Sequence, residues 1–302
     1  MIYDTIIIGA GPAGLTAAIY LKRANKSVLV LEKETFGGQI THSPKVENFP
    51  GFISISGVEF ADKLVEQAMA QGADIDLDEA KGISKDGDIF TVKGSRTDYK
   101  AKSVIIATGS KHRTLGLDGE EKFTGEGISY CAVCDGAFYK DNDIAVIGGG
   151  NSALQEAILL AKTSKSVTVI QNLPFLTGEK KLIEQIEATD NISVIFSSVV
   201  TKILGSDKFE GITIRNEETN EEKDLTFDGI FVAIGQQPEN ESFRNAVVLD
   251  ERGYISADES CIPEGENGIF VAGDCRSKAV RQIATAVSDG AAASVAVCRY
   301  LG

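Results

Sequence analysis

Residues 4–33 read DTIIIGAGPAGLTAAIYLKRANKSVLVLEK, and residues 143–172 read DIAVIGGGNSALQEAILLAKTSKSVTVIQN. The two stretches align without a gap. Each contains a short apolar strand, a glycine turn, a segment of about twelve residues with helical apolar periodicity, a Lys-Ser pair and a second apolar strand. That is the strand–helix–strand order of a nucleotide-binding βαβ unit. The sequence therefore predicts an α/β chain in which this unit occurs twice.

Each glycine turn places small residues where a dinucleotide site needs them. The first small residue permits the tight turn, the second lets a pyrophosphate approach the backbone, and the third lets helix and strand pack closely. The helix N-terminus then offers N–H groups and a positive dipole end to the phosphates. A βα turn without a ligand is the alternative, and it is stronger for the second copy. The residues concerned are Gly9, Gly11 and Gly14 in the first copy and Gly148, Gly150 and Ala153 in the second.

The residue that ends the second strand differs between the two copies. Glu32 ends the second strand of the first copy, where an acid can accept hydrogen bonds from a ribose 2′-hydroxyl and favours the adenosine of FAD or NAD. A surface glutamate at a strand end is the alternative. Gln171 holds the equivalent position in the second copy, and Asn172 and Leu173 follow it. That stretch has no acid for a hydroxyl and no arginine for a 2′-phosphate, so the second copy predicts a dinucleotide fold without nucleotide-identifying side chains.

Cys131 and Cys134 are the redox candidates. Two residues between them let both sulfurs meet across one turn and cycle between dithiol and disulfide, and Asp135 is placed to move a proton. A zinc site would need further ligands at paired spacing, which the three scattered cysteines and two histidines do not supply. No metal is therefore expected. Two unpaired structural cysteines are the alternative.

Length and charge narrow the class of protein. The chain has 302 residues, which suggests about two domains. Its net charge of −14 repels phosphate backbones, so a nucleic-acid partner is not expected. No apolar run approaches a membrane span, and the N-terminus MIYDTIII lacks the positive region of a signal peptide. We expect a cytoplasmic protein without a membrane partner.

Further segments fit the α/β prediction. Three short apolar runs that end in glycine read as buried strands, at residues 103–107, 228–234 and 268–272. Residues 284–299 are small and apolar and predict a packed terminal helix, in which Gly290 is tolerated at some cost. Residues 207–224 predict a solvated hairpin with a turn near Thr219 and Asn220.

Taken together, the motifs of this chain resemble those of the low-molecular-weight thioredoxin reductases, flavoproteins of the two-dinucleotide-domain type. The resemblance runs nearly from end to end. The matching motifs are GAGPAG (9–14), GGQ (37–39), ENFPG (47–51), ATGS (107–110), CAVCDG (131–136), GGGNSA (148–153), Gly273-Asp274 and Arg281-Gln282.

The resemblance implies two Rossmann-like domains, one inserted into the other. An FAD-binding domain would span residues 1–112 and 240–302, and an NAD(P)-type domain carrying the cysteine pair would span 113–239. Cys134 would take electrons from the flavin, Cys131 would attack the disulfide of thioredoxin, and Asp135 would act as acid and base. The family rotates the smaller domain between flavin and partner, and forms homodimers. The FAD contacts implied are Gly9, Gly11, Pro12, Ala13, Gly14, Glu32, Gly38, Gln39, Asn48, Ala107, Thr108, Gly109, Gly273, Asp274, Arg281, Gln282 and Ile283.

One departure concerns the electron donor. Members that use NADPH carry His-Arg-Arg-x-x-x-Arg after the second strand of the second copy, where this chain has Gln171–Thr177 and none of the arginines. Charge-assisted hydrogen bonds contribute roughly 1.5–3 kcal/mol each, so their loss weakens NADPH binding by orders of magnitude. The chain thus resembles the ferredoxin-dependent flavin thioredoxin reductases, and reduced ferredoxin is the expected donor. NADH and NADPH, in that order, are the alternatives.

Two alternatives concern the acceptor and the class of protein. The same reductase could act on a peroxiredoxin-type or glutaredoxin-like protein. The chain could also be a non-catalytic FAD-binding module whose cysteine pair senses the redox state for a partner. Multiple turnover of a disulfide substrate separates an enzyme from such a sensor.

Overall fold

Both copies of the repeat fold as the sequence predicts. In the first copy β1 (Ile2–Ile8) leads through the glycine turn to α1 (Pro12–Arg23) and β2 (Val28–Glu32). In the second copy β9 (Asp143–Ile147) leads to α5 (Asn151–Leu160) and β10 (Ser166–Ile170). The structure is a computed structural model that describes residues 1–43, 45–265 and 267–302. The predicted α/β class with two Rossmann-like units is confirmed.

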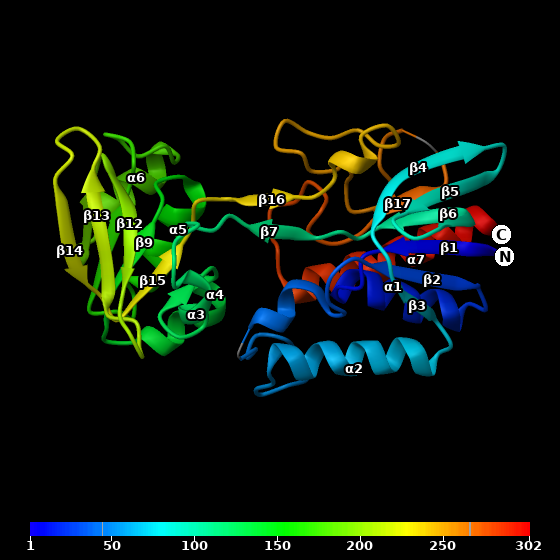
Figure 1. Ribbon diagram of the computed structural model, residues 1–302, viewed down its shortest axis with the longest axis horizontal. Helices are drawn as coiled ribbons and strands as arrows, with labels where there is room; N and C mark the ends of the chain where they lie inside the picture. The colour runs from blue at the N-terminus through cyan, green and yellow to red at the C-terminus, as the bar shows by residue number, and fades with distance from the viewer. Residues whose placement is uncertain (44, 266) are drawn as a thin grey trace. The chain divides into compact units, whose positions relative to one another are not determined.

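The chain divides into two units (Figure 1). Unit 1 comprises Met1–Lys111 and Gln237–Gly302, and unit 2 comprises His112–Gln236. The chain leaves unit 1 within β7 (Ser110–His112) and returns within β16 (Gln236–Pro238), and these strands form a two-stranded sheet.

The remaining elements of unit 1 are the 3-10 helices η1 (Gly38–His42) and η3 (Glu241–Phe243), helices α2 (Gly57–Ala70) and α7 (Ile283–Leu301), and strands β3 (Asp74–Leu77), β4 (Ala80–Asp86), β5 (Ile89–Gly94), β6 (Asp98–Ile106) and β17 (Ile269–Val271). Those of unit 2 are helices α3 (Glu120–Phe123), α4 (Ala132–Asp135), η2 (Gly136–Tyr139) and α6 (Lys180–Glu187), and strands β8 (Ile128–Ser129), β11 (Ile192–Ile195), β12 (Ser198–Leu204), β13 (Gly211–Asn216), β14 (Glu222–Thr226) and β15 (Gly229–Val232).

The core of unit 1 is a sheet of order β3-β2-β1-β6-β5-β4, in which β17 also pairs with β6. The pairs among β1, β2, β3 and β6 are parallel, whereas β4, β5 and β6 are antiparallel neighbours. Because successive side chains of a strand point to opposite faces, Ile7 packs with α1 and α7 while Ile6 and Ile8 pack against the other face. Burial on both faces explains the continuous apolar run of β1.

Unit 2 repeats this plan with a smaller sheet of order β11-β10-β9-β15-β8, all parallel. Helix α5 covers one face of this sheet, where Val146 of β9 and Phe231 of β15 pack against it. The antiparallel sheet β12-β13-β14 covers the other face with Ile212 and Ile214. The predicted hairpin and its turn are confirmed as β13 and β14, with Asn220 at φ 60°. The prediction that the hairpin is solvated is wrong for β13, because Ile212 and Ile214 are buried in the core, whereas β14 is largely exposed.

The terminal helix is confirmed, and the structure explains its glycine. Helix α7 packs on α1, and a Cβ on Gly290 would collide with the backbone oxygen of Ala13. Gly290 is therefore required by the close approach of two helices rather than merely tolerated. In the described parts of the chain, no helix combines the length and the apolar character needed to cross a bilayer.

Candidate active site

The first glycine turn leaves room at the start of α1. Gly11 is the N-cap of α1 with φ −80°, and Pro12 begins the helix. A Cβ added to Gly14 would collide with the backbone oxygen of Gly9, so the third glycine is needed for packing. A Cβ on Gly11 would meet only the oxygen of Gly37, at 3.9 Å. The second glycine therefore faces open space at a helix N-terminus, where an anion is stabilised.

Glu32 holds this turn in place. Its Oε2 accepts a hydrogen bond from the N–H of Ala10 at 2.8 Å, and its Oε1 accepts those of Lys33 and Glu34 at 2.9 Å each. A carboxylate has about four lone-pair sites, so one remains for a ribose hydroxyl. The sequence indicated the ribose role but not this structural one, because only the fold brings Ala10 to the end of β2.

A cavity of about 310 Å³ opens beside Glu32 in unit 1. It is lined by Gly9, Thr108, Pro238 and Glu239 among others. The Oγ1 of Thr108 donates to Oδ1 of Asn240 at 2.9 Å, which fixes the end of β6 to the returning chain. The cavity thus lies where the carboxyl ends of parallel strands meet, the usual ligand position of such sheets.

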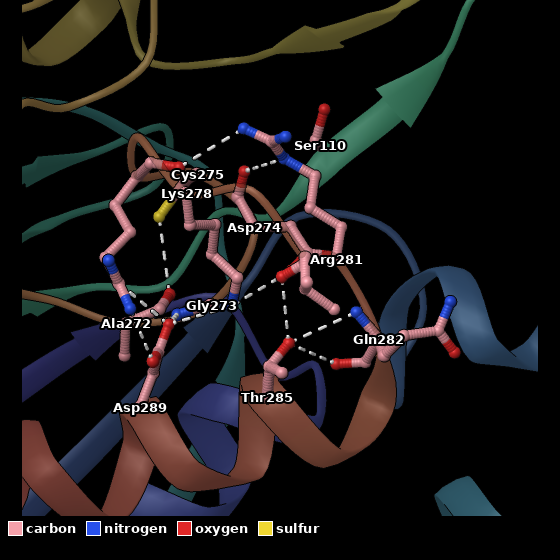
Figure 2. A network of polar contacts seen from close by, with 12 residues as sticks. Ser110, Ala272, Gly273, Asp274, Cys275, Lys278, Arg281, Gln282, Thr285 and Asp289 are labelled. Atoms are coloured by element: carbon pink, nitrogen blue, oxygen red, sulfur yellow. Dashed lines mark hydrogen bonds and ion pairs between the residues drawn. The ribbon is translucent and has the colours of Figure 1, made fainter. Parts of the chain in front are cut away.

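The Gly273-Asp274 segment follows β17 and lies beside α7 (Figure 2). The N–H of Gly273 donates to Oδ2 of Asp289 at 3.0 Å, and Lys278 Nζ reaches the same oxygen at 3.0 Å. The nearest cation to Oδ1 of Asp274 is Lys278 Nζ at 3.5 Å. Burial raises the pKa of Asp274, partly offset by Lys278 and Arg281. Asp274 thus keeps a buried acceptor whose hydrogen-bonding capacity is largely unused.

Asp289 itself was not anticipated from the sequence. Besides Gly273 and Lys278 it binds Arg276, whose Nη2 lies 2.9 Å from its Oδ1. These interactions, with that of Arg276 as the largest, lower the pKa of Asp289 against the effect of its burial. The available signal was an acid within an otherwise small and apolar helix.

Three predicted residues meet near the start of α7. Gln282 is the N-cap of α7 and forms a capping box with Thr285. The Nδ2 of Asn48 donates to Oε1 of Gln282 at 3.1 Å. Arg281 lies 4.1 Å above the ring of Tyr254, and its Nε donates to the backbone oxygen of Asp274 at 3.4 Å (Figure 2).

The other predicted contacts of unit 1 are distributed around the same sheet edge. Gly38 and Gln39 begin η1, and Ile283 begins α7. Ala107 follows β6, its backbone oxygen lies against Gly9, and Gly109 has φ +71°. Ala13 is buried in α1 against Gly273.

These features of unit 1 fit the FAD that the motifs imply. The open side of Gly11 suits a pyrophosphate, the remaining lone pair of Glu32 suits a ribose, and the unused oxygen of Asp274 suits a hydroxylated chain. Each requirement is met by a residue that the protein itself leaves incompletely partnered.

The redox turn, residues 131–135, lies in unit 2. Cys131 and Cys134 form a disulfide with sulfurs 2.11 Å and Cα atoms 5.3 Å apart. Cys131 is the N-cap of the short helix α4, and its Sγ accepts from the N–H of Cys134 at 3.2 Å. The N–H of Cys131 donates in turn to Ser129 Oγ at 3.1 Å. Backbone N–H groups near the sulfurs favour the thiolate that the reduced pair would need.

Asp135 follows directly and is set for proton transfer. Its Oδ2 accepts from Ser129 Oγ at 2.6 Å. The buried Oδ1 has no hydrogen-bond partner among the residues that the structure describes. Burial raises the pKa of Asp135, against the opposing effect of Ser129. An acid whose proton is held more tightly than usual can donate it nearer neutral pH.

The loop after β10 packs on the second glycine turn, as Gly37, whose N–H donates to the oxygen of Ala10 at 2.8 Å, packs on the first. The side-chain amide of Gln171 lies against Gly149, where a Cβ would be 2.5 Å from its Cδ, and its Nε2 donates to the oxygen of Phe175 at 3.2 Å. The N–H and Oγ1 of Thr177 donate to the oxygen of Gly149 at 2.8 and 3.2 Å. Residues 171–177 thus fold back onto the turn.

Glu179 extends the segment that contacts the second glycine turn, so this covering loop comprises residues 171–179. The N–H of Glu179 donates to Oδ1 of Asn151 at 2.7 Å, and the Nδ2 of Asn151 donates to Oε1 of Glu179 at 3.2 Å. Asn151 is the first residue of α5. The carboxylate of Glu179 therefore lies beside the side chain of the first residue of α5.

Comparison with known proteins places this geometry among disulfide reductases. A family model described as pyridine nucleotide-disulphide oxidoreductase matches residues 3–290. A Clostridium pasteurianum protein described as a 34.2 kDa protein in the rubredoxin operon is 42% identical over 99% of this chain and 97% of its own. The thioredoxin reductase of Bacillus subtilis is 40% identical over 99% of this chain and 95% of its own. The crystal structure of thioredoxin reductase from Streptococcus pyogenes is 42% identical and matches with a TM-score of 0.94, covering 99% of this chain and 98% of that one.

Proposed function

The chain belongs to the pyridine nucleotide-disulphide oxidoreductase family, and we propose that it is an FAD-dependent thioredoxin reductase that receives its electrons from reduced ferredoxin. Relatives named thioredoxin reductase match it over nearly their whole length, which supports the reaction. The structural feature that carries the proposal is the disulfide at the start of α4 with the buried Asp135 beside it.

In the proposed enzyme unit 1 is the FAD-binding domain and unit 2 the domain that carries the cysteine pair. Gly11 and the start of α1 would face the pyrophosphate, Glu32 the ribose and Asp274 the ribityl chain. When bound, FAD supplies an electron pair to a disulfide. All later covalent steps take place at Cys131 and Cys134.

The cysteine steps balance as follows. Reduction of the Cys131–Cys134 disulfide through Cys134 takes up two electrons and one proton, and leaves Cys134 as a thiol and Cys131 as a thiolate. Cys131 Sγ attacks one sulfur of the thioredoxin disulfide and breaks that bond, and Asp135 protonates the departing thiolate. Cys134 then attacks Cys131 Sγ, which restores the internal disulfide and releases reduced thioredoxin. Two electrons pass to thioredoxin in each cycle.

The proposal of ferredoxin as donor rests on the second glycine turn. Residues 171–177 carry no cation for a 2′-phosphate. Thr177 bonds to Gly149 of the turn, Glu179 bonds to Asn151 of α5, and the Gln171 side chain bonds to Phe175 within the loop. A relative described as part of a rubredoxin operon is consistent with electron supply by a small iron protein. An enzyme supplied in this way would keep the second βαβ unit as the carrier of its redox turn.

Anaerobic mixing tests the donor. The oxidised holoenzyme is mixed separately with photochemically reduced ferredoxin, NADH and NADPH, and the flavin absorbance is followed. We expect rapid bleaching by ferredoxin alone. Equally rapid bleaching by NADH or NADPH would contradict the donor and show that residues 148–153 still hold a nucleotide.

Cys134→Ser tests the route through the cysteines. Its flavin should still be reduced by the working donor, while thioredoxin turnover is lost because the internal disulfide cannot form. Full thioredoxin turnover by this variant would overturn the mechanism. Wild-type protein assayed with peroxiredoxin-type and glutaredoxin-like disulfides in place of thioredoxin tests the alternative acceptors.

NADH is the alternative donor, because β9, the glycine turn and α5 are complete as a dinucleotide fold. A non-catalytic FAD-binding redox sensor is the alternative class, and steady multiple turnover with any donor excludes it. The proposal includes a cytoplasmic homodimer, as the family resemblance implies, and sedimentation of the holoenzyme tests the dimer.

A further inference from the structure

Glu156 is an acid in the helix that follows the second glycine turn. The positions that α5 buries around it are apolar, namely Ala153, Leu154, Ala157 and Leu160. The equivalent position of the first copy is Ala17, which is fully buried in α1. The βαβ unit therefore does not require an acid at this position, and Glu156 distinguishes the unit that carries the redox turn.

The carboxylate of Glu156 holds the redox turn directly. It accepts a hydrogen bond from the backbone N–H of Ala132. Ala132 is the first residue of α4 and follows Cys131, so this N–H has no partner within the short helix. The contact ties the start of α4 to α5 at the peptide bond that joins Cys131 to Ala132.

The other oxygen of Glu156 is buried without compensation. In residues 1–43, 45–265 and 267–302, nothing donates a hydrogen bond to Oε2. A buried carboxylate oxygen without a donor disfavours the charged form. Burial accordingly raises the pKa of Glu156 to about 7, against the smaller opposing effect of the Ala132 N–H.

Other charges near α5 do not account for the raised pKa of Glu156. The pKa of Glu156 has only the two causes given above, and no charged side chain is among them. The titratable groups on the elements packed against α5 are Asp135 on α4, Tyr139 on η2, Asp143 on β9, and Lys180, Lys181, Glu184 and Glu187 on α6; β10 carries none. Asp143 is bound to Lys165 at 2.6 Å, and Lys180 lies 3.8 Å from Glu184.

We propose that Glu156 is a positioning residue of the redox turn and that it takes up a proton when the Cys131–Cys134 disulfide is reduced. The inference rests on the proposed function, in which this disulfide cycles. Reduction adds two electrons and breaks the S–S bond. Cys134 takes a proton from water, and Cys131, the residue that precedes Ala132, remains a thiolate. The new negative charge opposes an ionised Glu156, which then binds a second proton from water.

The proton uptake makes the disulfide harder to reduce as the pH rises. Below the pKa of Glu156 the carboxyl is already neutral and leaves the thiolate unopposed. Above the pKa of Glu156, reduction must either bring a proton to Glu156 or place two negative charges, those of Cys131 and Glu156, beside the Cys131–Ala132 peptide. Glu156→Gln keeps an oxygen for the Ala132 N–H but has no charge, so its disulfide should lack this dependence.

Redox equilibration of the holoenzyme tests the inference without thioredoxin or a donor. Wild type, Glu156→Gln and the exposed control Glu187→Gln are equilibrated with dithiothreitol buffers, the thiols are alkylated, and peptide masses report Cys131 and Cys134. Because wild type and variants are compared at the same pH, the pH dependence of the dithiothreitol couple affects all of them equally. We expect equal reduction within about twofold at about pH 6, and a Glu156→Gln disulfide about three- to tenfold easier to reduce at about pH 8.5. Glu187→Gln should follow wild type throughout.

Other outcomes overturn the inference. A Glu156→Gln disulfide that differs from wild type by the same factor at both pH values would show a structural role only. A disulfide that no dithiothreitol buffer reduces would instead remove the proposed function. If Glu156→Gln does not fold, infrared difference spectra of wild type decide the matter. A protonated-carboxyl band that grows on reduction and persists in Asp135→Asn is expected, and its absence contradicts the proton uptake.

Discussion

The two glycine turns share a backbone and differ in what lies over it. Gly11 and Gly150 are the N-caps of α1 and α5, with φ −80° and ψ −177° in the first and φ −86° and ψ 178° in the second. A Cβ on either glycine would meet one atom at van der Waals distance, the oxygen of Gly37 at 3.9 Å in the first and Oγ1 of Thr177 at 3.8 Å in the second. The turns differ in that the side chain of Gln171 lies against Gly149. The glycine motif thus fixes a strand–turn–helix geometry, and the two turns differ in the side chains that follow the second strand.

The strand ends show the same contrast. Glu32 accepts hydrogen bonds from the backbone N–H groups of Ala10, Lys33 and Glu34. Gln171 instead lays its side chain against Gly149 and bonds to Phe175. One side chain thus accepts a hydrogen bond from the backbone of its glycine turn, and the other packs against the backbone of its turn.

Matched aspartates at the two N-caps should give the largest difference. Asp is favoured at an N-cap and both positions have ordinary φ, so Gly11→Asp and Gly150→Asp should fold. In Gly11→Asp the carboxylate meets the pyrophosphate, and FAD affinity should fall at least about 100-fold, near 3 kcal/mol. Flavin fluorescence titration of the apoprotein measures it.

Gly150→Asp is the control for that experiment. It should bind FAD as wild type does and turn over thioredoxin with reduced ferredoxin within about twofold. Loss of turnover with the working donor would show that a nucleotide binds at the second turn, and the contrast between the turns would fail.

Removing the two strand-end side chains should separate their structural roles. Glu32→Ala leaves three backbone N–H groups without their acceptor and should lower the free energy of unfolding by about 2–4 kcal/mol. Gln171→Ala removes one hydrogen bond and should lower it by about 1 kcal/mol. Urea unfolding at saturating FAD provides the comparison, with Glu32→Gln expected between the two. Equal losses would contradict the role of Glu32 as the support of its turn.

The two repeat helices should also differ in their response to pH. The pKa of Glu156 is about 7 in the folded protein and 4.5 when unperturbed, whereas α1 has Ala17 at that position. A raised folded pKa gives stability that is fully present below the unfolded pKa and is lost as the pH rises through the folded value. Wild type should therefore lose on the order of 1–3 kcal/mol relative to Glu156→Gln between about pH 4.5 and about pH 7. Urea midpoints across this range test it, and parallel curves would contradict the buried acid.

Thr177→Val should have the smallest effect. It removes the 3.2 Å hydrogen bond from Oγ1 to Gly149 but keeps the one from the backbone N–H. We expect a loss of about 0.5–1 kcal/mol and faster amide exchange confined to the covering loop. Unchanged exchange in residues 172–179 would show that the side chain does not hold the loop down.

Local pattern was enough to predict the elements of both repeats. Apolar runs, glycine turns and helical periodicity predicted β1, α1, β9 and α5, and the terminal helix expected at 284–299 is Ile283–Leu301. The Cys131–Cys134 pair was also visible, because two sulfurs three residues apart can meet within one turn. These features depend on neighbours in the sequence.

Features that depend on distant neighbours were missed. Gly290 is needed because Ala13 lies against it, and Glu32 supports a turn that lies more than twenty residues earlier in the chain. The missing arginines were legible in the sequence, but the covering of Gly149 by Gln171 was not. No periodicity encodes which side chain of one element reaches the backbone of another.

The sequence by itself determined the repeated α/β fold, the site of the disulfide and the absence of a cation for a 2′-phosphate, since each follows from residue type and spacing. Only the tertiary structure decided that Gln171 lies against Gly149, that Asp274 keeps an unused acceptor, and that Glu156 accepts a hydrogen bond from the Ala132 N–H. Those properties depend on burial and hydrogen bonding between distant segments, and these become defined only when the chain is folded.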